Sequence, residues 1–357
     1  MVHYSIDTNI RAQTYGAIML TAIAIQSILN SLFSFLQTQV LFVDISSLSA
    51  FTIFTAMFVG YDNFCWCWKI GRIRLSTVPD FTGEWLGYIY ERKEYAAHDD
   101  VFVERVQELI AVNLYVRQTF RQISVRLRSI PNHSSKSRES ECTTAGLFIQ
   151  DYERPKLTYT WIRSDLAGSG EFLRKSEDTR AILEGHYQSN YPRLGLIKLT
   201  RKEDGEIWHC GKLTIIQSPY GRPYLGVHIP EDFVLPCLNE MKKALSENNF
   251  EKYRQNQNIR DDGGFHMTVL EPSEYLAHRD KLQDHIDETS VWIRLIGLGE
   301  QSRQHEHVYY CVLQCEGAEL LRNRAGLGIK DMHVTLGFLS NDLHEVPKGL
   351  STLIRRI

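Results

Sequence analysis

Two short motifs in the last third of the chain pair a histidine with a threonine two positions later. They are His266-x-Thr268 and His333-x-Thr335, and they lie 67 residues apart. Apolar, strand-forming residues flank both motifs. Because residues i and i+2 of a β-strand point to the same face, each motif projects an imidazole and a hydroxyl together.

Two such strands placed side by side would form a cleft suited to phosphodiester chemistry. One imidazole would take a proton from the attacking oxygen and the other would donate one to the leaving oxygen, which imidazoles do well near neutral pH. The threonine hydroxyls can donate to the non-bridging phosphate oxygens, where negative charge builds up. This chemistry requires neither a metal nor a cofactor, and Cys65-x-Cys67 has no second pair at zinc-site spacing.

The paired motifs, the second of which runs into Leu-Gly-Phe, resemble those of the 2H phosphoesterase superfamily. The resemblance covers about residues 206–357 and implies a C-terminal α+β 2H phosphoesterase fold. It further implies that His266 and His333 are the acid/base pair and that Thr268 and Thr335 bind phosphate. The family includes enzymes for 2′,3′-cyclic phosphates, 2′,5′ linkages and cyclic oligonucleotides, so the fold does not decide the substrate.

The residues around the motifs predict the elements that position them. Strand patterns occur within 214–229, at Val291–Leu298 and at Val308–Gln314, and helical spacing occurs at Glu231–Asn248, Glu274–Ile286 and Gly317–Leu327. Tyr224, on the first of these strands, is a candidate substrate-binding residue that would stack a base at the cleft. We expect His228 to lie in the core and Lys330 to be solvated.

The middle of the chain, about residues 80–204, has an alternating apolar and polar pattern. Gln122–Arg128, for example, places three branched apolar residues on one face and polar residues on the other. Turn-rich stretches such as Ala167–Gly170 separate the runs. Seven or eight strands in about 120 residues predict a closed, all-β eight-strand barrel.

The first 60 residues contain only three charged side chains, Asp7, Arg11 and Asp44. The apolar runs at about residues 15–36 and 40–60 predict a hairpin of two transmembrane helices, since about 20 residues cross a bilayer. Basic residues precede the first run and follow the second, so both ends of the hairpin are expected in the cytoplasm.

A polar stripe on the first helix contains Gln26, Asn30 and three serines at helical spacing. In lipid, polar side chains seek partners on a neighbouring helix. The stripe therefore indicates either packing within the hairpin or a homo-oligomer formed through the transmembrane helices.

The order of these parts resembles the two-transmembrane, β-strand-rich effectors of CBASS-type bacterial anti-phage defence. The residues that carry the resemblance are the linker sequence Pro79–Gly87, which leads into the barrel, and Gly185-His186-Tyr187 near its end. The resemblance covers about residues 10–204. It implies that the barrel senses a cyclic nucleotide or short oligonucleotide and that the helices assemble in the inner membrane.

The chain of 357 residues has 40 basic and 43 acidic residues and a formal net charge of −3. This balance excludes a broad polycationic nucleic-acid binder and favours a compact nucleotide over a long nucleic acid. The predicted parts are a transmembrane hairpin with a basic linker over 1–75, the barrel over 80–204 and the 2H domain over 206–357.

The leading hypothesis is a bacterial inner-membrane, two-pass defence protein whose N- and C-terminal parts lie in the cytoplasm. Its barrel would sense a cyclic nucleotide, and its metal-independent phosphodiesterase domain would cleave a cyclic (oligo)nucleotide or a 2′,3′-cyclic or 2′,5′ phosphodiester. One alternative is a ligand-gated, membrane-disrupting effector whose 2H-like domain only binds nucleotide. Another is an RNA end-processing phosphoesterase.

Overall fold

The structure is a computed structural model that describes most of the chain. The described residues are 2–3, 8–37, 49–70, 73–76, 78–93, 105–130, 141–150, 156–163, 166–177, 180–189, 194–218, 221–286, 289–344 and 346–357. The chain divides into two compact units. The first contains Met1–Trp85, Leu114–Leu127 and Glu141–Leu196. The second contains Leu86–Asn113, Arg128–Ser140 and Ile197–Ile357.

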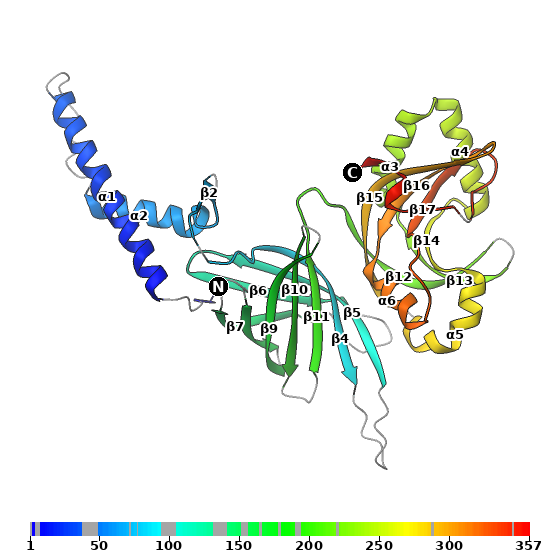
Figure 1. Cartoon of the computed structure of the whole chain (residues 1–357), viewed down its shortest axis with the longest axis horizontal. Coiled ribbons are helices and arrows are strands. Elements are labelled where there is room, and N and C mark those ends of the chain that lie inside the picture. The colour runs from blue at the N-terminus through cyan, green and yellow to red at the C-terminus, as the bar shows by residue number, and fades with distance from the viewer. Residues whose placement is uncertain are drawn as a thin grey trace, which may run out of the picture. The chain divides into compact units, whose positions relative to one another are not determined.

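Eight consecutive strands form one large antiparallel sheet, which curves into a half-barrel (Figure 1). They are β4 (Gly83–Lys93), β5 (Arg105–Gln118), β6 (Gln122–Ser129), β7 (Glu141–Gln150), β8 (Lys156–Arg163), β9 (Leu166–Glu177), β10 (Arg180–Ser189) and β11 (Leu194–Arg201). The strand order is β1-β6-β5-β4-β11-β10-β9-β8-β7, with the short β1 (Val2–His3) at one end. β6 also pairs with β7.

The start of β9 corrects one prediction, because Ala167–Gly170 is strand and not turn. Its small residues lack the alternating apolar pattern, which hid the strand in the sequence. Gly170 is paired with Tyr159 on β8, and a Cβ at Gly170 would lie 2.6 Å from the Tyr159 hydroxyl. Glycine is therefore needed where the tyrosine ring crosses the strand.

The N-terminal part contains two helices, α1 (Thr8–Gln37) and α2 (Ala50–Gly60), followed by a π-helical turn, Tyr61–Cys65. The rings of Tyr15 and Phe58 meet at 5.2 Å, so the start of α1 lies beside the end of α2. Within the described residues one helical segment, Arg11–Leu32, is long and apolar enough to cross a membrane.

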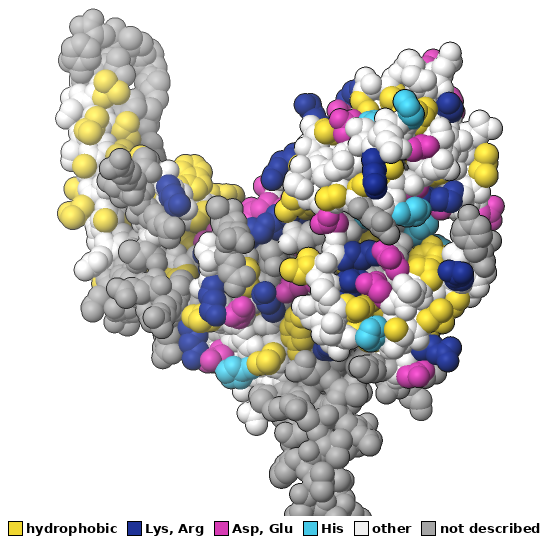
Figure 2. Space-filling view, turned by 45° about the vertical axis from the view of Figure 1, so that its right-hand side comes forward, with side chains coloured by type: hydrophobic (Ala, Val, Ile, Leu, Met, Phe, Trp, Pro, Cys, Tyr) yellow, Lys and Arg dark blue, Asp and Glu magenta, His cyan; other side chains and the backbone are white. Residues whose placement is uncertain are grey.

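The sequence predicted two such spans. Residues 40–48 of the second lie outside the described residues, and the 11 residues of α2 are too few to cross a bilayer alone. Hydrophobic side chains dominate the described surface of these helices, whereas charges of both signs are interspersed over the C-terminal part (Figure 2).

The C-terminal part contains a second antiparallel sheet with four helices. Its strands are β12 (Trp208–Gln217), β13 (Pro223–Ile229), β14 (Phe265–Leu270), β15 (Ser290–Arg303), β16 (Glu306–Gln314), β17 (His333–Phe338) and β18 (Leu353–Arg356). The order is β14-β13-β12-β15-β16-β17, and β18 pairs with β15. The helices are α3 (Glu231–Ala244), α4 (Glu247–Asp261), α5 (Pro272–Ile286) and α6 (Glu316–Arg324).

Minor elements complete the description. They are the strands β2 (Lys69–Ile70) and β3 (Ile73–Arg74), which pair with each other, and a 3-10 turn at Leu350–Thr352.

The helix predicted over Glu231–Asn248 is in fact the first of two, because α3 ends at Ala244 and α4 follows from Glu247. The sequence did not predict α4, whose side chains are almost all polar. Only Tyr253 and Gln257 are buried on it. A helix without an apolar stripe gives no periodic signal, yet α4 supports both histidine strands.

Candidate active site

The first His-x-Thr motif lies on β14, whose side chains alternate between the domain core and the opposite face of the strand. Phe265, Met267 and Val269 are buried in the domain core, while His266 and Thr268 are partly exposed on the opposite face. This confirms the predicted strand and the shared orientation of the two motif residues.

The second motif lies on β17, at the other end of the sheet order. Tyr310 of β16 is opposite Thr335, but its neighbour Tyr309 is opposite Gly337, so Leu336 is an extra residue in β17. Such a β-bulge reverses the faces that follow it. It keeps Thr335 on the cleft face while Gly337 packs against Tyr253 of α4, in the core.

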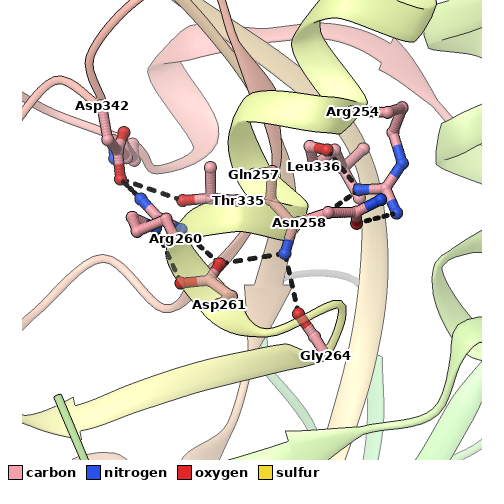
Figure 3. Close-up of polar contacts among 10 residues, drawn as sticks. Arg254, Gln257, Asn258, Arg260, Asp261, Gly264, Thr335, Leu336 and Asp342 are labelled. Carbon is pink, nitrogen blue, oxygen red and sulfur yellow. Dashed lines mark hydrogen bonds and ion pairs between the residues drawn. The ribbon is translucent and has the colours of Figure 1, made fainter. Parts of the chain in front are cut away.

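Helix α4 contacts both histidine strands through Arg254, whose bond to Leu336 of β17 is drawn in Figure 3. The guanidinium lies 4.7 Å from the centre of the Phe265 ring, next to His266. Its Nη1 donates to the carbonyl oxygen of Leu336 at 2.7 Å, which satisfies the bulged residue of β17. The side chain of Arg254 therefore contacts residues of both β14 and β17.

A group of buried charges lies beside the second motif, and the sequence analysis did not predict it. The hydroxyl of Thr335 donates to Asp342 Oδ2 at 3.3 Å, and Lys348 Nζ donates to Asp342 Oδ1 at 3.0 Å. Arg260, at the end of α4, forms ion pairs with both Asp342 and Asp261 (Figure 3). Only 6% of the Asp342 side chain and 5% of the Lys348 side chain are exposed.

These residues come from two segments that are 82 positions apart at Arg260 and Asp342, and they belong to no motif. The only available signal was the set of charged residues in the loop that follows the second His-x-Thr. We call Arg260, Asp261, Asp342 and Lys348 the charge cluster.

His333 has a hydrogen bond that decides its tautomer. Its Nδ1 lies 2.9 Å from the carbonyl oxygen of Asp331, and a carbonyl can only accept, so Nδ1 carries the proton. The lone pair is therefore on Nε2. Burial, and then the positive charge of Lys348, lower the pKa of His333 to about 3, so the ring is neutral near pH 7.

The charged neighbours of His266 act on its pKa in both directions, unlike the main influences on His333. Burial is the main cause that lowers the pKa of His266, and Arg260 and His228 lower it further. The carboxylates of Asp261 and Asp342 act in the opposite direction and favour the imidazolium. Asp342 exerts the same effect on His333, so the two motifs share one electrostatic environment.

For Tyr224, His228 and Lys330, the observed environment can be compared with the one expected from the sequence. The ring of Tyr224 lies 5.6 Å from the ring of His266, but only 7% of Tyr224 is exposed. His228 is exposed and not in the core, because it lies on the cleft face of β13 opposite His266. Lys330 is not free in solvent, since its Nζ pairs with Glu271 at 2.5 Å.

No group of three or more His, Cys, Asp or Glu side chains within the described ranges has a geometry that could hold a metal ion. Comparison with curated proteins and with solved structures gives no match. Residues 231–344 match the family model described as "2H-SAK: Swiss Army Knife, 2H phosphoesterase domain". The matched segment runs from the start of α3 to the loop after β17 and includes both His-x-Thr strands. This part of the chain is a 2H phosphoesterase domain, and the protein is accordingly a hydrolase of the 2H phosphodiesterase type.

Proposed function

We propose that the protein is a membrane-anchored, metal-independent phosphodiesterase that cleaves a cyclic or short nucleotide phosphodiester with His266 and His333. The observation that carries the proposal is that Asp342, which accepts a hydrogen bond from Thr335 of the second motif, favours the charged form of both His266 and His333. Two imidazoles in one cleft can perform both proton transfers of the reaction.

The two histidines are suited to different steps. His333 is neutral and its lone pair is fixed on Nε2, so we assign it the base that removes a proton from the attacking water or hydroxyl. His266 has the carboxylates of Asp261 and Asp342 nearby, and the charge of a bound phosphodiester would raise the pKa of both rings, which burial lowers in the free protein. We assign His266 the acid that protonates the leaving oxygen as the P–O bond breaks.

The threonines would stabilise the charge that develops on phosphorus-bound oxygens. Thr268 is partly exposed on the cleft face. Thr335 has a single hydroxyl proton, which it donates to Asp342 in the structure. A phosphate oxygen must therefore replace Asp342 as the acceptor when substrate binds, which makes Asp342 a competitor for the same donor.

Membrane anchoring and a sensing function for the half-barrel rest on separate observations. Only 11% of the apolar window in α1 is buried, whereas the core helix of a soluble protein would be mostly covered. The exposed residues Leu20, Ile28 and Leu32 would then face lipid. The pairing of β6 with β7 favours a closed ring of eight strands, and its interior is where a nucleotide signal would bind.

The substrate class is tested with the full chain in detergent or nanodiscs. The panel contains 2′,3′-cyclic mononucleotides, 2′,5′-linked dinucleotides and cyclic dinucleotides, and products are separated by chromatography. We expect turnover of at least one class by the wild type and none by the His266→Ala/His333→Ala variant. Equal product from both proteins would overturn the proposal.

A second candidate function, ligand-gated disturbance of the membrane, is favoured by a junction in the first unit. Asp62, 5% exposed, accepts from the backbone N–H of Arg121 at 3.0 Å and from its Nε at 3.1 Å. The backbone of Phe120 donates to the carbonyl of Asp62 at 3.0 Å. The turn between β5 and β6 is thereby joined to the segment after α2.

Leakage of a dye from vesicles tests this candidate. If the half-barrel gates the helices, leakage on adding a cyclic dinucleotide should persist in the His266→Ala/His333→Ala variant and disappear in Asp62→Asn. Leakage that does not depend on ligand, or none at all, contradicts it.

A further inference from the structure

A third histidine, His228 on β13, lies directly opposite the histidine of the first His-x-Thr motif. In the pairing of β13 with β14, His228 is opposite His266 and Gly226 is opposite Thr268. Side chains that are directly opposite in an antiparallel pair point to the same face, with Cβ atoms about 5 Å apart. The pairing therefore places the ring of His228 next to that of His266. His228 is also exposed to solvent.

Tyr224 also lies on β13. It is on the same face as Gly226 and His228, since these three positions alternate along one strand. Burial raises the pKa of Tyr224 to about 12, so its hydroxyl remains a proton donor near pH 7. Gly226, which lies between Tyr224 and His228, leaves β13 without a side chain opposite Thr268.

No structural role accounts for His228. Its ring makes no hydrogen bond or ion pair with any residue that the structure describes, and it is not packed in the core. A positive charge on His228 disfavours the positive form of His266 and so lowers the pKa of His266. A bound anion between the two rings would convert this repulsion into two attractions.

We propose that His228, bordered by Tyr224, forms a second phosphate subsite beside the reacting phosphodiester. This inference rests on the proposed function and specifies its substrate. The preferred substrate would have at least two phosphate groups in neighbouring nucleotide units, as in an oligonucleotide or a cyclic dinucleotide. A mononucleoside 2′,3′-cyclic phosphate would leave the subsite empty.

The test uses two pairs of compounds that differ by one nucleotide unit and its phosphate. For turnover these are adenosine 2′,3′-cyclic phosphate and the dinucleotide ApA with a 2′,3′-cyclic phosphate end. For equilibrium binding they are adenosine 2′-phosphate and ApA with a 2′-phosphate end. The full chain is compared with His228→Ala and His228→Gln, and the control is His305→Ala, an exposed histidine in the turn between β15 and β16.

The wild type should prefer the two-phosphate member of each pair. His228→Ala should lose about tenfold of that preference, as for a charge-assisted hydrogen bond. His228→Gln should retain part of it, and His305→Ala all of it. An equal change for both members, or no change for either, would overturn the subsite.

Failure of the proposed function has a different signature. In that case the wild type would turn over neither cyclic phosphate, while the binding comparison would still decide whether His228 recognises a second phosphate. If binding is also equal for wild type and His228→Ala, the subsite is refuted independently of catalysis.

Discussion

Thr335 donates its only hydroxyl proton to Asp342, across 3.3 Å, at the position where the motif implies that Thr335 should hold phosphate. The same carboxylate is paired with Lys348 and Arg260, so it is held in place whether or not Thr335 is bonded to it. In the proposed mechanism, this carboxylate accepts the Thr335 proton that an anionic oxygen of the substrate would accept in its place.

Removing the charge of Asp342 should destabilise the C-terminal domain. In Asp342→Asn the ammonium of Lys348, 5% exposed, would lose its counter-charge, and breaking a buried pair costs about 3–5 kcal/mol. We expect the thermal midpoint to fall by on the order of 10 °C. The variant Asp342→Asn/Lys348→Met should recover part of this loss. A midpoint within 1–2 °C of wild type, roughly the scatter of surface substitutions, would show that the pair is energetically unimportant.

Arg254 is expected to act as a positioning residue for both histidines. Its planar guanidinium stacks on Phe265 and donates to Leu336, and lysine cannot reproduce both contacts. Arg254→Lys should lower kcat by about 10–100-fold, because small displacements of catalytic groups are costly.

The matched control for this variant is Arg279→Lys on α5, where the arginine is exposed. Equal rates for Arg254→Lys and Arg279→Lys would refute the positioning role. A loss of activity in Arg254→Lys accompanied by a change in substrate KM only would place the effect on binding instead of geometry.

The lowered pKa values of the two motif histidines predict a pH dependence of stability. The pKa of His333 is about 3 in the folded state, below its usual value of 6.5, so between these values the unfolded chain binds more protons than the folded one. Stability should therefore fall as the pH falls from 6.5 toward 3. His266, whose pKa is also lowered, adds in the same direction.

Thermal midpoints measured between pH 7.5 and 4.5 check this expectation. The wild type should lose more stability than His333→Gln over that range, because glutamine does not titrate. Parallel pH curves for the two proteins would contradict a neutral His333 with a lowered pKa in the folded state.

Insertion of α1 into a bilayer predicts sensitivity to charge. Ile23→Arg places a cation near the middle of the apolar window, at a cost of about 2.5–3.5 kcal/mol on insertion scales. The variant should shift from the membrane fraction to the soluble or aggregated fraction. Ile329→Arg, at a position 90% exposed in the C-terminal part, should fractionate as wild type. Identical fractionation of both variants would argue against a membrane role for α1.

The sequence predicted those features that have a local signature. Alternating residues located seven of the eight strands from β4 to β11, and His-x-Thr in apolar surroundings located β14 and β17 with the correct faces. The strand at Leu166–Glu177 was missed because its glycines and serines carry no pattern, and α4 was missed because it has no apolar stripe.

The charge cluster was beyond prediction for a different reason. Arg260 and Asp342 are separated by 82 positions and meet only because α4 packs against β17. Exposure of His228 likewise depends on pairing register, which decides which face of β13 borders the cleft. Such relationships belong to the tertiary structure and leave no mark in a single sequence.

The most direct test of the account is the rate of phosphodiester hydrolysis by the full chain in the presence of a metal chelator. Single-turnover rates would be measured for wild type, His266→Gln, His333→Gln and the control His305→Gln on the best compound of the panel. We predict that each of the first two substitutions lowers the rate by about 10²–10⁴-fold, with the control and the chelator without effect. Wild-type rates in either His266→Gln or His333→Gln, or loss of the wild-type rate on chelation, would contradict two-histidine catalysis.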